Sequence, residues 1–326
     1  MKKILVIQPL RPEALTLLAA REDVRVEVVT DYSAENLMRR VADADAITVR
    51  DAPLSIDVLE AAPDVKVIAR HGVGYDNIPI DYCTARRLPV ALVGDVNAVS
   101  VAEHTMLLML AAARKMHRLD AAIRRGDFAA RTQLIGIELR GRTLLIVGFG
   151  RIGREVARRA MAFGMNVQVF DPYTDKRPAD VVFVDGLNEG LRHADIVSVH
   201  VPLSAPTRNL IGSAELALLR PGAILINTAR GGVVDEAALL LALQSGHVRG
   251  AGLDTFLIEP LPSDHPLALE PNVVLSPHSA ALTEESLIAM GLATARNALA
   301  GLDGNLDPEV VVNRSVLDAG RLDAAQ

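Results

Sequence analysis

A glycine-rich segment, Gly148–Gly153, stands between an apolar run and a helical pattern and reads Gly-Phe-Gly-Arg-Ile-Gly. The spacing GxGxxG is weak evidence alone, because glycine is common in turns. Here the glycines permit a tight turn, close approach of a pyrophosphate and close packing of a helix on a strand. The N–H groups that open the following helix carry the partial positive charge that binds phosphate. The segment predicts a dinucleotide site at Gly148, Gly150, Arg151, Ile152 and Gly153.

Asp171 ends the next apolar run, 18 residues after Gly153. A carboxylate at this position accepts hydrogen bonds from the hydroxyl groups of an adenosine ribose. The same carboxylate would repel a 2′-phosphate, so NAD is predicted in preference to NADP. Lys176 and Arg177 follow closely and leave NADP open as an alternative.

Three further polar segments each follow an apolar run: Asn227–Gly232, Leu253–Pro260 and Ser276–Ala280. In open α/β sheets, ligands bind beyond the carboxyl ends of the strands, so these segments should share one edge with the glycine loop. Reduction of a 2-keto acid needs a hydride, a proton and a cation for the carboxylate. Arginine offers a planar fork for carboxylate and carbonyl oxygens, and histidine paired with glutamate delivers a proton near neutral pH. Arg230, Glu259 and His278 are the candidates.

The elements that must position these residues form an alternation of apolar runs and helical patterns, which is typical of doubly wound parallel sheets. The N-terminal strands are predicted over Lys3–Ile7, Val24–Val29, Ala46–Val49, Val65–Ala69 and Pro89–Leu92. A long helix over Val101–Arg118 follows, with Ser100 as N-cap and Glu103 completing a capping box. Later strands are predicted over Thr143–Val147, Asn166–Phe170, Val181–Val184, Asp195–Val199, Ala223–Ile226, Gly250–Leu253 and Val273–Leu275. A last helix over Leu287–Ala300 is expected to return to the first sheet.

Composition supports this α/β fold class with two doubly wound sheets. The 326 residues are 50% hydrophobic but only 3% aromatic, so aliphatic side chains must fill about two cores. Net charge is −6 without a basic stripe, which predicts no nucleic-acid or anionic membrane partner. No apolar run reaches the roughly 18 residues of a spanning helix. The single cysteine, Cys83, is expected to be an inert packing thiol in a reducing cytoplasm, and no cluster has metal-ligand spacing.

Taken together, the motifs resemble the D-isomer-specific 2-hydroxyacid dehydrogenase family over nearly the whole chain. Further matching segments are Ala69–Ile78, Asn97 with Ser100–His104, Gly136–Gly153 and Val201–Leu203. The resemblance implies a Rossmann NAD-binding domain over residues 99–287. It also implies a smaller flavodoxin-like substrate domain made of residues 1–98 and 288–326. Catalysis between the domains and a homodimer built on the nucleotide domains are further implications.

Carried over by position, the resemblance implies that Arg230 binds the substrate carboxylate and carbonyl, that His278 is the acid/base and that Glu259 is its partner. Two backbone N–H groups, those of Val73 and Gly74, would bind the carboxylate. Asp254 would hydrogen-bond the nicotinamide amide. Cofactor contacts are implied for Thr228, Ala229 and Ala280. His71 and His104 are expected to be structural or cofactor-adjacent.

The leading hypothesis is therefore a cytoplasmic NAD-dependent dehydrogenase that interconverts a small D-2-hydroxy acid and its 2-keto acid. Phosphoglycerate dehydrogenase is an alternative, but Arg50-Asp51 stands where the family often has Arg-Ser, and no serine-sensing extension follows the last helix. An NAD-sensing, corepressor-like binding protein is the alternative from another class. Val73 argues against a phosphite dehydrogenase and Glu259 against a formate dehydrogenase, because those relatives have Lys and Gln, respectively, at these positions.

Overall fold

The computed structural model describes residues 1–317, and the chain separates into two compact units. The first comprises residues 1–97 together with the chain from Thr283 on, and the second comprises Ala98–Leu282. Each unit is a parallel sheet with helices on both faces, which confirms the predicted fold class. The divisions lie one and five residues before the expected boundaries, because helix α12 (Glu284–Leu302) belongs wholly to the first unit. That the units serve substrate and cofactor, respectively, stays a prediction.

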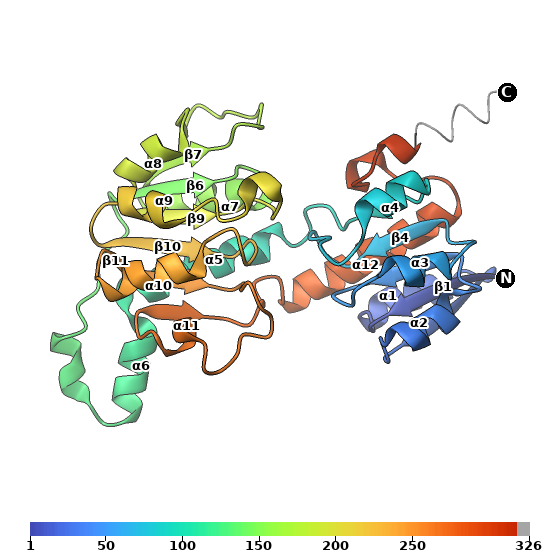
Figure 1. Ribbon diagram of the computed structural model, residues 1–326, viewed down its shortest axis with the longest axis horizontal. Helices are drawn as coiled ribbons and strands as arrows, with labels where there is room; N and C mark the ends of the chain where they lie inside the picture. The colour runs from blue at the N-terminus through green and yellow to red at the C-terminus, as the bar shows by residue number, and fades with distance from the viewer. Residues whose placement is uncertain (318–326) are drawn as a thin grey trace. The chain divides into compact units, whose positions relative to one another are not determined.

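The sheet of the first unit has the strand order β2-β1-β3-β4-β5, which is the flavodoxin-like order. Its strands are β1 (Lys2–Ile7), β2 (Val24–Val29), β3 (Ala46–Val49), β4 (Val67–Arg70) and β5 (Val90–Ala91). Along β1, Leu5 and Ile7 face one core while Ile4 and Val6 face the other. The first core packs against α2 (Ala34–Val41), α3 (Ile56–Glu60) and α4 (Ile80–Ala85). The second packs against α1 (Pro12–Ala19) and α12 (Figure 1).

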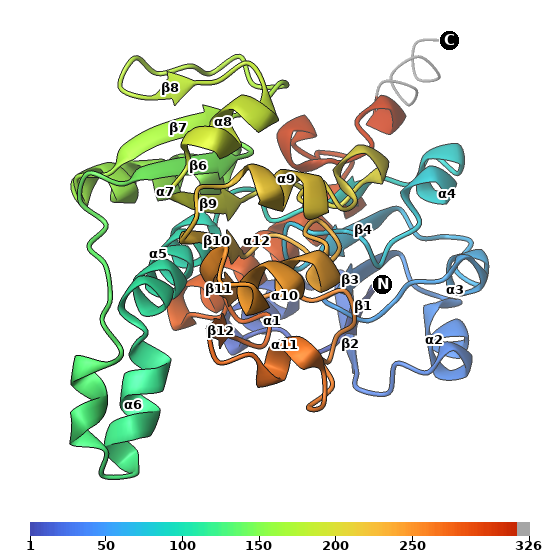
Figure 2. The ribbon, with the colours of Figure 1, turned by 60° about the vertical axis from the view of Figure 1, so that its left-hand side comes forward.

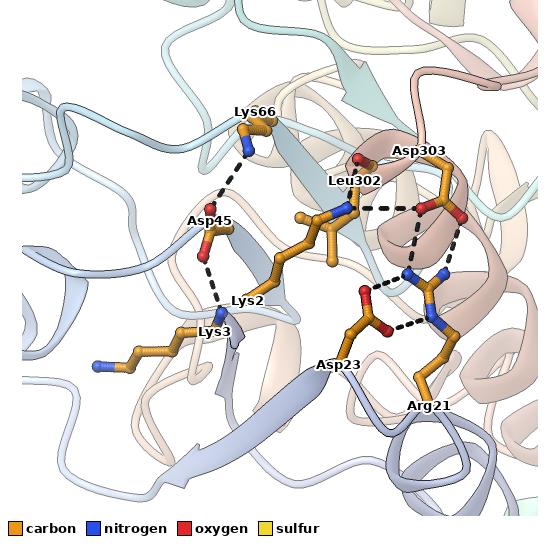
Figure 3. Close-up of polar contacts among 8 residues, drawn as sticks. All are labelled: Lys2, Lys3, Arg21, Asp23, Asp45, Lys66, Leu302 and Asp303. Carbon is orange, nitrogen blue, oxygen red and sulfur yellow. Dashed lines mark hydrogen bonds and ion pairs between the residues drawn. The ribbon is translucent and has the colours of Figure 1, made fainter.

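Helix α12 is also tied to the first unit by charged side chains at its C-terminal end (Figure 3). Lys2 donates a hydrogen bond of 3.1 Å to the carbonyl of Leu302. Asp303, the C-cap, pairs with the guanidinium of Arg21 at 2.8 Å, and Arg21 also holds Asp23 at 2.7 Å. These contacts join the start of β1, the turn before β2 and the end of α12. The return of the last helix to the first sheet is confirmed.

The second sheet has the order β12-β11-β10-β9-β6-β7-β8. Read from β8, this is the Rossmann order with one extra strand at the β12 edge. Its strands are β6 (Thr143–Val147), β7 (Asn166–Phe170), β8 (Val182–Phe183), β9 (Ile196–Val199), β10 (Ala223–Asn227), β11 (Val248–Leu253) and β12 (Val273–Leu275). One face packs against α5 (Ala98–Arg114) and α7 (Arg151–Ala162). The other packs against α8 (Leu187–His193), α9 (Ser213–Leu218), α10 (Glu236–Gln244) and α11 (Pro266–Leu269).

The long helix before this sheet departs from its prediction at both ends. It begins at Ala98, so Ser100 lies inside the first turn and is not the N-cap. Ala98 and Val101 are buried, so the first turn of the helix is packed in the protein core. The helix stops at Arg114 because Lys115 adopts a left-handed conformation (φ 54°). The returning chain causes this stop, since the N–H of Ile137 donates to the carbonyl of Ala113 at 2.9 Å.

After Lys115 the chain continues as α6 (Met116–Arg124) and a short 3-10 helix, Phe128–Thr132. Figure 2 shows α6 and the segment that follows it extending away from the sheet of the second unit. Their exposed apolar side chains are Met116, Ile123, Phe128 and Ile135. Over residues 1–317, no helix is long and apolar enough to cross a membrane.

Candidate active site

The glycine loop joins β6 to α7 at the point where the strand order of the second sheet reverses. A side chain at Gly148 (φ 96°) would come within 2.8 Å of the carbonyl of His200, and one at Gly153 within 2.2 Å of the carbonyl of Gly148. At Gly150, by contrast, no atom lies within 4 Å of that position. Gly150 is the N-cap of α7 and offers no side chain to the N–H groups of Arg151 and Ile152. The loop is therefore closed on the protein side and open to a phosphate at the helix start.

Asp171 follows β7 directly, as predicted from its spacing. Its two oxygens accept backbone N–H groups, from Phe149 at 2.7 Å and from Tyr173 at 2.9 Å. Each carboxylate oxygen keeps a second lone pair for a further donor, such as a ribose hydroxyl. Asp171 lines an open pocket of about 330 Å³ together with Gly150, Arg154 and Lys176. These residues fit the adenosine ribose of a dinucleotide, with basic side chains at the same pocket.

The loop that carries Arg230 is shaped by Asn227 at the end of β10. The side chain of Asn227 accepts the N–H of Ala229 at 3.0 Å and donates to the carbonyl of Arg230 at 2.9 Å. Thr228 is buried, and its hydroxyl lies 2.8 Å from that of Thr105 on α5. The guanidinium of Arg230 donates to the carbonyl of Ala229 at 2.7 Å. A single buried amide thus fixes the backbone on either side of the arginine.

A second loop, residues 254–260, is packed directly on the first. The site of a side chain at Gly231 lies 1.9 Å from the carbonyl of Phe256, so only glycine allows this approach. Glu236, at the start of α10, accepts the N–H of Leu257. Glu259 turns inward, and its Oε1 accepts the N–H of Phe256 at 3.0 Å. Contact between the two loops brings Glu259 to the same edge of the sheet as Arg230.

His278, after β12, completes this group. Its Nδ1 lies 2.8 Å from Oε2 of Glu259. A carboxylate can only accept, so Nδ1 carries a hydrogen and Nε2 is the nitrogen left to exchange a proton with a ligand. Nε2 has no partner among the described residues, and the side chain is 45% exposed. The structure therefore brings Arg230, Glu259 and His278 together in the arrangement of an acid/base with a nearby cation.

The charges of these groups are coupled. The hydrogen bond to Glu259 raises the pKa of His278 above its usual value, although burial and the charge of Arg230 oppose this. For Glu259, burial alone would raise the pKa, but the hydrogen bonds from His278 and Phe256 outweigh it and hold the pKa below its usual value. Ionised Glu259 therefore favours the protonated form of His278 relative to an isolated imidazole.

Asp254 and Ala280 adjoin His278, whose N–H donates to the carbonyl of Asp254. Asp254 is 0% exposed, and its carboxylate accepts the N–H groups of Ser279 and Ala280, each at 2.9 Å. Burial opposes ionisation, but the hydrogen bonds from His104, Ser276 and these N–H groups keep the pKa of Asp254 below its usual value. In this structure the carboxylate is turned toward the protein, and its contacts support the His278 loop.

Val73 and Gly74 belong to the first unit, where they follow β4. Among residues 1–317, neither N–H group donates a hydrogen bond, which leaves two adjacent donors for an anion. His71 precedes them and is buried, and burial with the charges of Arg50 and Arg70 lowers its pKa to about 4. A neutral imidazole of this kind agrees with a structural role. Cys83 is fully buried, and burial raises the pKa of its thiol to about 11, so it carries no thiolate near neutral pH.

Residues 106–280 match the family model described as D-isomer specific 2-hydroxyacid dehydrogenase, NAD binding domain. The chain belongs to this family. It is 44% identical over 95% of its length to a D-3-phosphoglycerate dehydrogenase of Methanocaldococcus jannaschii, although it spans only 59% of that relative. It is 38% identical to a glyoxylate reductase of Aeropyrum pernix, with 97% of both chains covered. A structure of D-lactate dehydrogenase from Aquifex aeolicus with NAD and lactic acid matches with a TM-score of 0.85 at 30% identity, covering 95% of this chain and 99% of that one.

Family membership confirms NAD as the predicted cofactor class, since the matched region is the NAD-binding domain. Three residues of this family member received no individual role from the sequence and hold its loops: Asn227, Glu236 and Ser276. His104, expected to be structural or cofactor-adjacent, contacts Ser276. Asn227 ends a strand and Ser276 directly follows one, and these positions were the available signal for a role in the site. Glu236 and His104 lie on helices far away in sequence, so their contacts could not be inferred from spacing. Within residues 1–317, no three His, Cys, Asp or Glu side chains gather as metal ligands.

Proposed function

We propose that this chain is an NAD-dependent dehydrogenase that interconverts a short D-2-hydroxy acid and its 2-keto acid. The observation that carries the proposal is the 2.8 Å pair of His278 and Glu259, from two loops at the same edge of the sheet as Arg230, within an NAD-binding unit. Histidine supplies the proton, glutamate keeps it available, and arginine supplies the cation for a carboxylate.

In the reductive direction, Arg230 holds the carboxylate and polarises the carbonyl of the keto acid. NADH held along the glycine loop would supply the hydride that the carbonyl carbon takes up and would leave as NAD. The π electron pair of the carbonyl moves to its oxygen, which takes the proton from Nε2 of His278. Glu259 remains ionised and keeps the imidazole oriented through Nδ1. We assign the two N–H groups of Val73 and Gly74, in the first unit, to carboxylate binding.

Cofactor contacts are assigned to the residues around the glycine loop and to the strand ends beside it. Gly148, Gly150, Arg151, Ile152 and Gly153 would hold the pyrophosphate, and Asp171 the adenosine ribose. Thr228, Ala229 and Ala280 line the neighbouring strand ends. Asp254 takes the nicotinamide amide only if its carboxylate, now fully buried, turns outward.

The test is a panel of keto acids, including glyoxylate, hydroxypyruvate and pyruvate, offered to the purified protein with NADH and with NADPH. Oxidation of NADH with at least one short keto acid, compared by kcat/KM, is expected. NADH binding without turnover on any member of the panel would contradict the proposal. That outcome would favour the alternative of an NAD-sensing binding protein.

A phosphorylated substrate is the second candidate, because the chain is 44% identical to a D-3-phosphoglycerate dehydrogenase. Against it stands Asp51, whose side chain is 72% exposed and pairs with Arg70 at 3.3 Å. This carboxylate follows Arg50 and would repel a phosphate dianion. Including 3-phosphohydroxypyruvate in the panel decides between the two substrate classes.

We further propose a homodimer in the cytoplasm. Support for the dimer comes from Met116, Ile123, Phe128 and Ile135, four exposed apolar side chains on and near α6. Exposed apolar groups gathered on one projecting segment are typical of interaction surfaces. A mass of two chains in light scattering, reduced to one by Phe128→Glu, is expected. For the compartment, the support is the single reduced cysteine, Cys83.

A further inference from the structure

The backbone of His278 has an unusual conformation, and the hydrogen bond to Glu259 does not explain what holds it. Its φ angle is 50°, in the left-handed region that residues other than glycine rarely occupy. Such a conformation persists only where the surrounding structure holds it. The imidazole reaches Glu259 from this backbone, so whatever fixes the loop also fixes the proton donor.

The support comes from Asp254, at the end of β11. Three consecutive N–H groups of the loop donate to this one residue. The N–H of His278 donates to its carbonyl at 2.8 Å. Those of Ser279 and Ala280 donate to its carboxylate oxygens, each at 2.9 Å. The position of the loop therefore depends on the orientation of a fully buried carboxylate.

That carboxylate is oriented in turn by Ser276 and His104. The hydroxyl of Ser276 donates to Oδ1 of Asp254 at 2.6 Å. Its oxygen lies 2.8 Å from Nε2 of His104, which is also 3.5 Å from Oδ1 of Asp254. A hydroxyl has one hydrogen, and an ionised carboxylate can only accept. Nε2 of His104 must therefore be the donor to Ser276.

We propose that His104 and Ser276 are positioning residues that act through Asp254 to hold His278 in its left-handed conformation against Glu259. The hydrogen bonds run in one direction, from His104 to Ser276 to Asp254, which then accepts the loop N–H groups. His104 is anchored on α5, a helix of 17 residues. Its side chain is 18% exposed and its Nε2 is occupied, so it does not take the proton-transfer role of His278.

This inference rests on the proposed function for its effect on turnover, but its first test does not. The imidazole of His278 is titrated by NMR in the protein without substrate, with its signal assigned by His278→Gln. Glu259, Arg230 and Asp254 are the charged groups that act on it. If Ser276 holds the pair together, Ser276→Val lowers the pKa of His278 relative to the wild type. Ser276→Thr, which has the same shape as valine but keeps the hydroxyl, leaves the pKa near the wild-type value.

The second test measures reduction of the best keto acid. Ser276→Val is expected to lower kcat by roughly 10- to 100-fold, the size expected for a displaced catalytic group, without a matching loss of NADH affinity. His104→Leu should act in the same direction, and His104→Gln, whose amide can replace the Nε2 donor, should restore most of kcat. NADH affinity is followed by fluorescence. Thermal unfolding of each variant checks that it is folded.

The His104 variants keep the test decisive if Ser276→Val fails to fold. In a double-mutant cycle, His104→Leu and Glu259→Gln should be non-additive, because both act through His278. Equal losses in the threonine and valine variants would overturn the proposal, since shape and not the hydroxyl would then matter. An unchanged His278 pKa in folded Ser276→Val and His104→Leu would overturn it as well. Absence of turnover in the wild type would instead contradict the proposed function and leave the NMR result to decide this inference.

Discussion

Asp254 and Asp171 both follow a strand at the carboxyl edge of the second sheet, yet their surroundings differ. Asp254 is fully buried, and side chains as well as backbone N–H groups donate to it. Asp171 is half-buried, accepts only backbone N–H groups and faces an open pocket. The carboxylate of Asp254 is occupied by donors within the protein, whereas that of Asp171 can still accept hydrogen bonds from a ligand.

The two regions therefore differ in how strictly their geometry has to be held. Around His278 a small displacement would take a proton donor out of reach, so the loop is held by many internal hydrogen bonds. Around Asp171 the task is to distinguish a hydroxyl from a phosphate, which charge and space accomplish with less rigid geometry. Losses on mutation should therefore decrease from the proton-transfer loop to the ribose pocket.

The largest loss is expected for His278→Gln. Removal of the proton donor should lower kcat by roughly 100-fold or more, as is typical when a general acid is lost. NADH affinity should stay close to the wild-type value, because the proposed mechanism gives His278 a role toward the substrate and none in holding the cofactor. Stopped-flow absorbance gives the rate and fluorescence the affinity. His193→Gln, an exposed histidine at the end of α8, is the matched control. Near-normal turnover in His278→Gln would remove this residue from the mechanism.

The next loss is expected for Arg230→Lys. Lysine keeps the charge but lacks the planar fork that binds two oxygens at once. Loss of one charge-assisted hydrogen bond, about 1.5–3 kcal/mol, should reduce kcat/KM for the keto acid by roughly 10- to 100-fold. Both a higher KM and a lower kcat are expected. Arg192→Lys on α8 serves as control. If only NADH affinity changed, Arg230 would be a cofactor residue.

Much of this architecture was predictable because parallel strands leave a strong signal. Each predicted strand forms, and its ends move by at most two residues. A buried strand such as β6 is apolar on both faces, so a run of aliphatic residues between turns identifies it. The residues of the site were predictable for a related reason. Gly148, Arg230 and His278 each stand directly or shortly after such a run, at the edge where parallel sheets bind ligands.

The features that could not be predicted depend on contacts between parts of the chain that are distant in sequence. Helix α5 stops at Arg114 because Ile137 donates to one of its last carbonyls, and no local propensity encodes that contact. Serine is a typical N-cap residue, but the helix begins two residues before Ser100, at Ala98, whose side chain is buried. The supporting contacts of Asp254 come from α5 and from the end of β12, more than twenty residues away in either direction. Sequence spacing predicted which side chains gather at this edge of the sheet but not the contacts that hold them.

A smaller effect is expected for Asp171→Ser at the ribose pocket. Removing the carboxylate should narrow the NAD to NADP ratio of kcat/KM by about tenfold, chiefly by improving NADP use, because one like-charge repulsion disappears. Lys176 and Arg154 line the same pocket and are placed to hold the added phosphate. Asp175→Ser is the control, since Asp175 lines this pocket but does not accept the N–H of Phe149. A wild type that already prefers NADPH would contradict the assignment of Asp171.

A change chiefly in pH dependence, and the sharpest test of the comparison, is expected for Glu259→Gln. Glutamine keeps the length of the side chain and one acceptor oxygen but removes the charge that raises the pKa of His278. Reduction requires protonated His278, so activity is lost as pH rises through that pKa. Because the variant lowers the pKa, the alkaline limb of the kcat profile should move to lower pH, while the rate at lower pH falls only a few-fold.

Glu236→Gln supplies the control for this shift. Glu236 supports the same loop through the N–H of Leu257 but has no contact with His278, so its variant should leave the position of the limb unchanged. An unshifted limb in Glu259→Gln would mean that the two side chains are not coupled in solution. A large loss at every pH would mean that glutamine's single acceptor, which cannot serve both Phe256 and His278, has disturbed the loop itself. The two outcomes separate the charge of Glu259 from its part in holding the geometry.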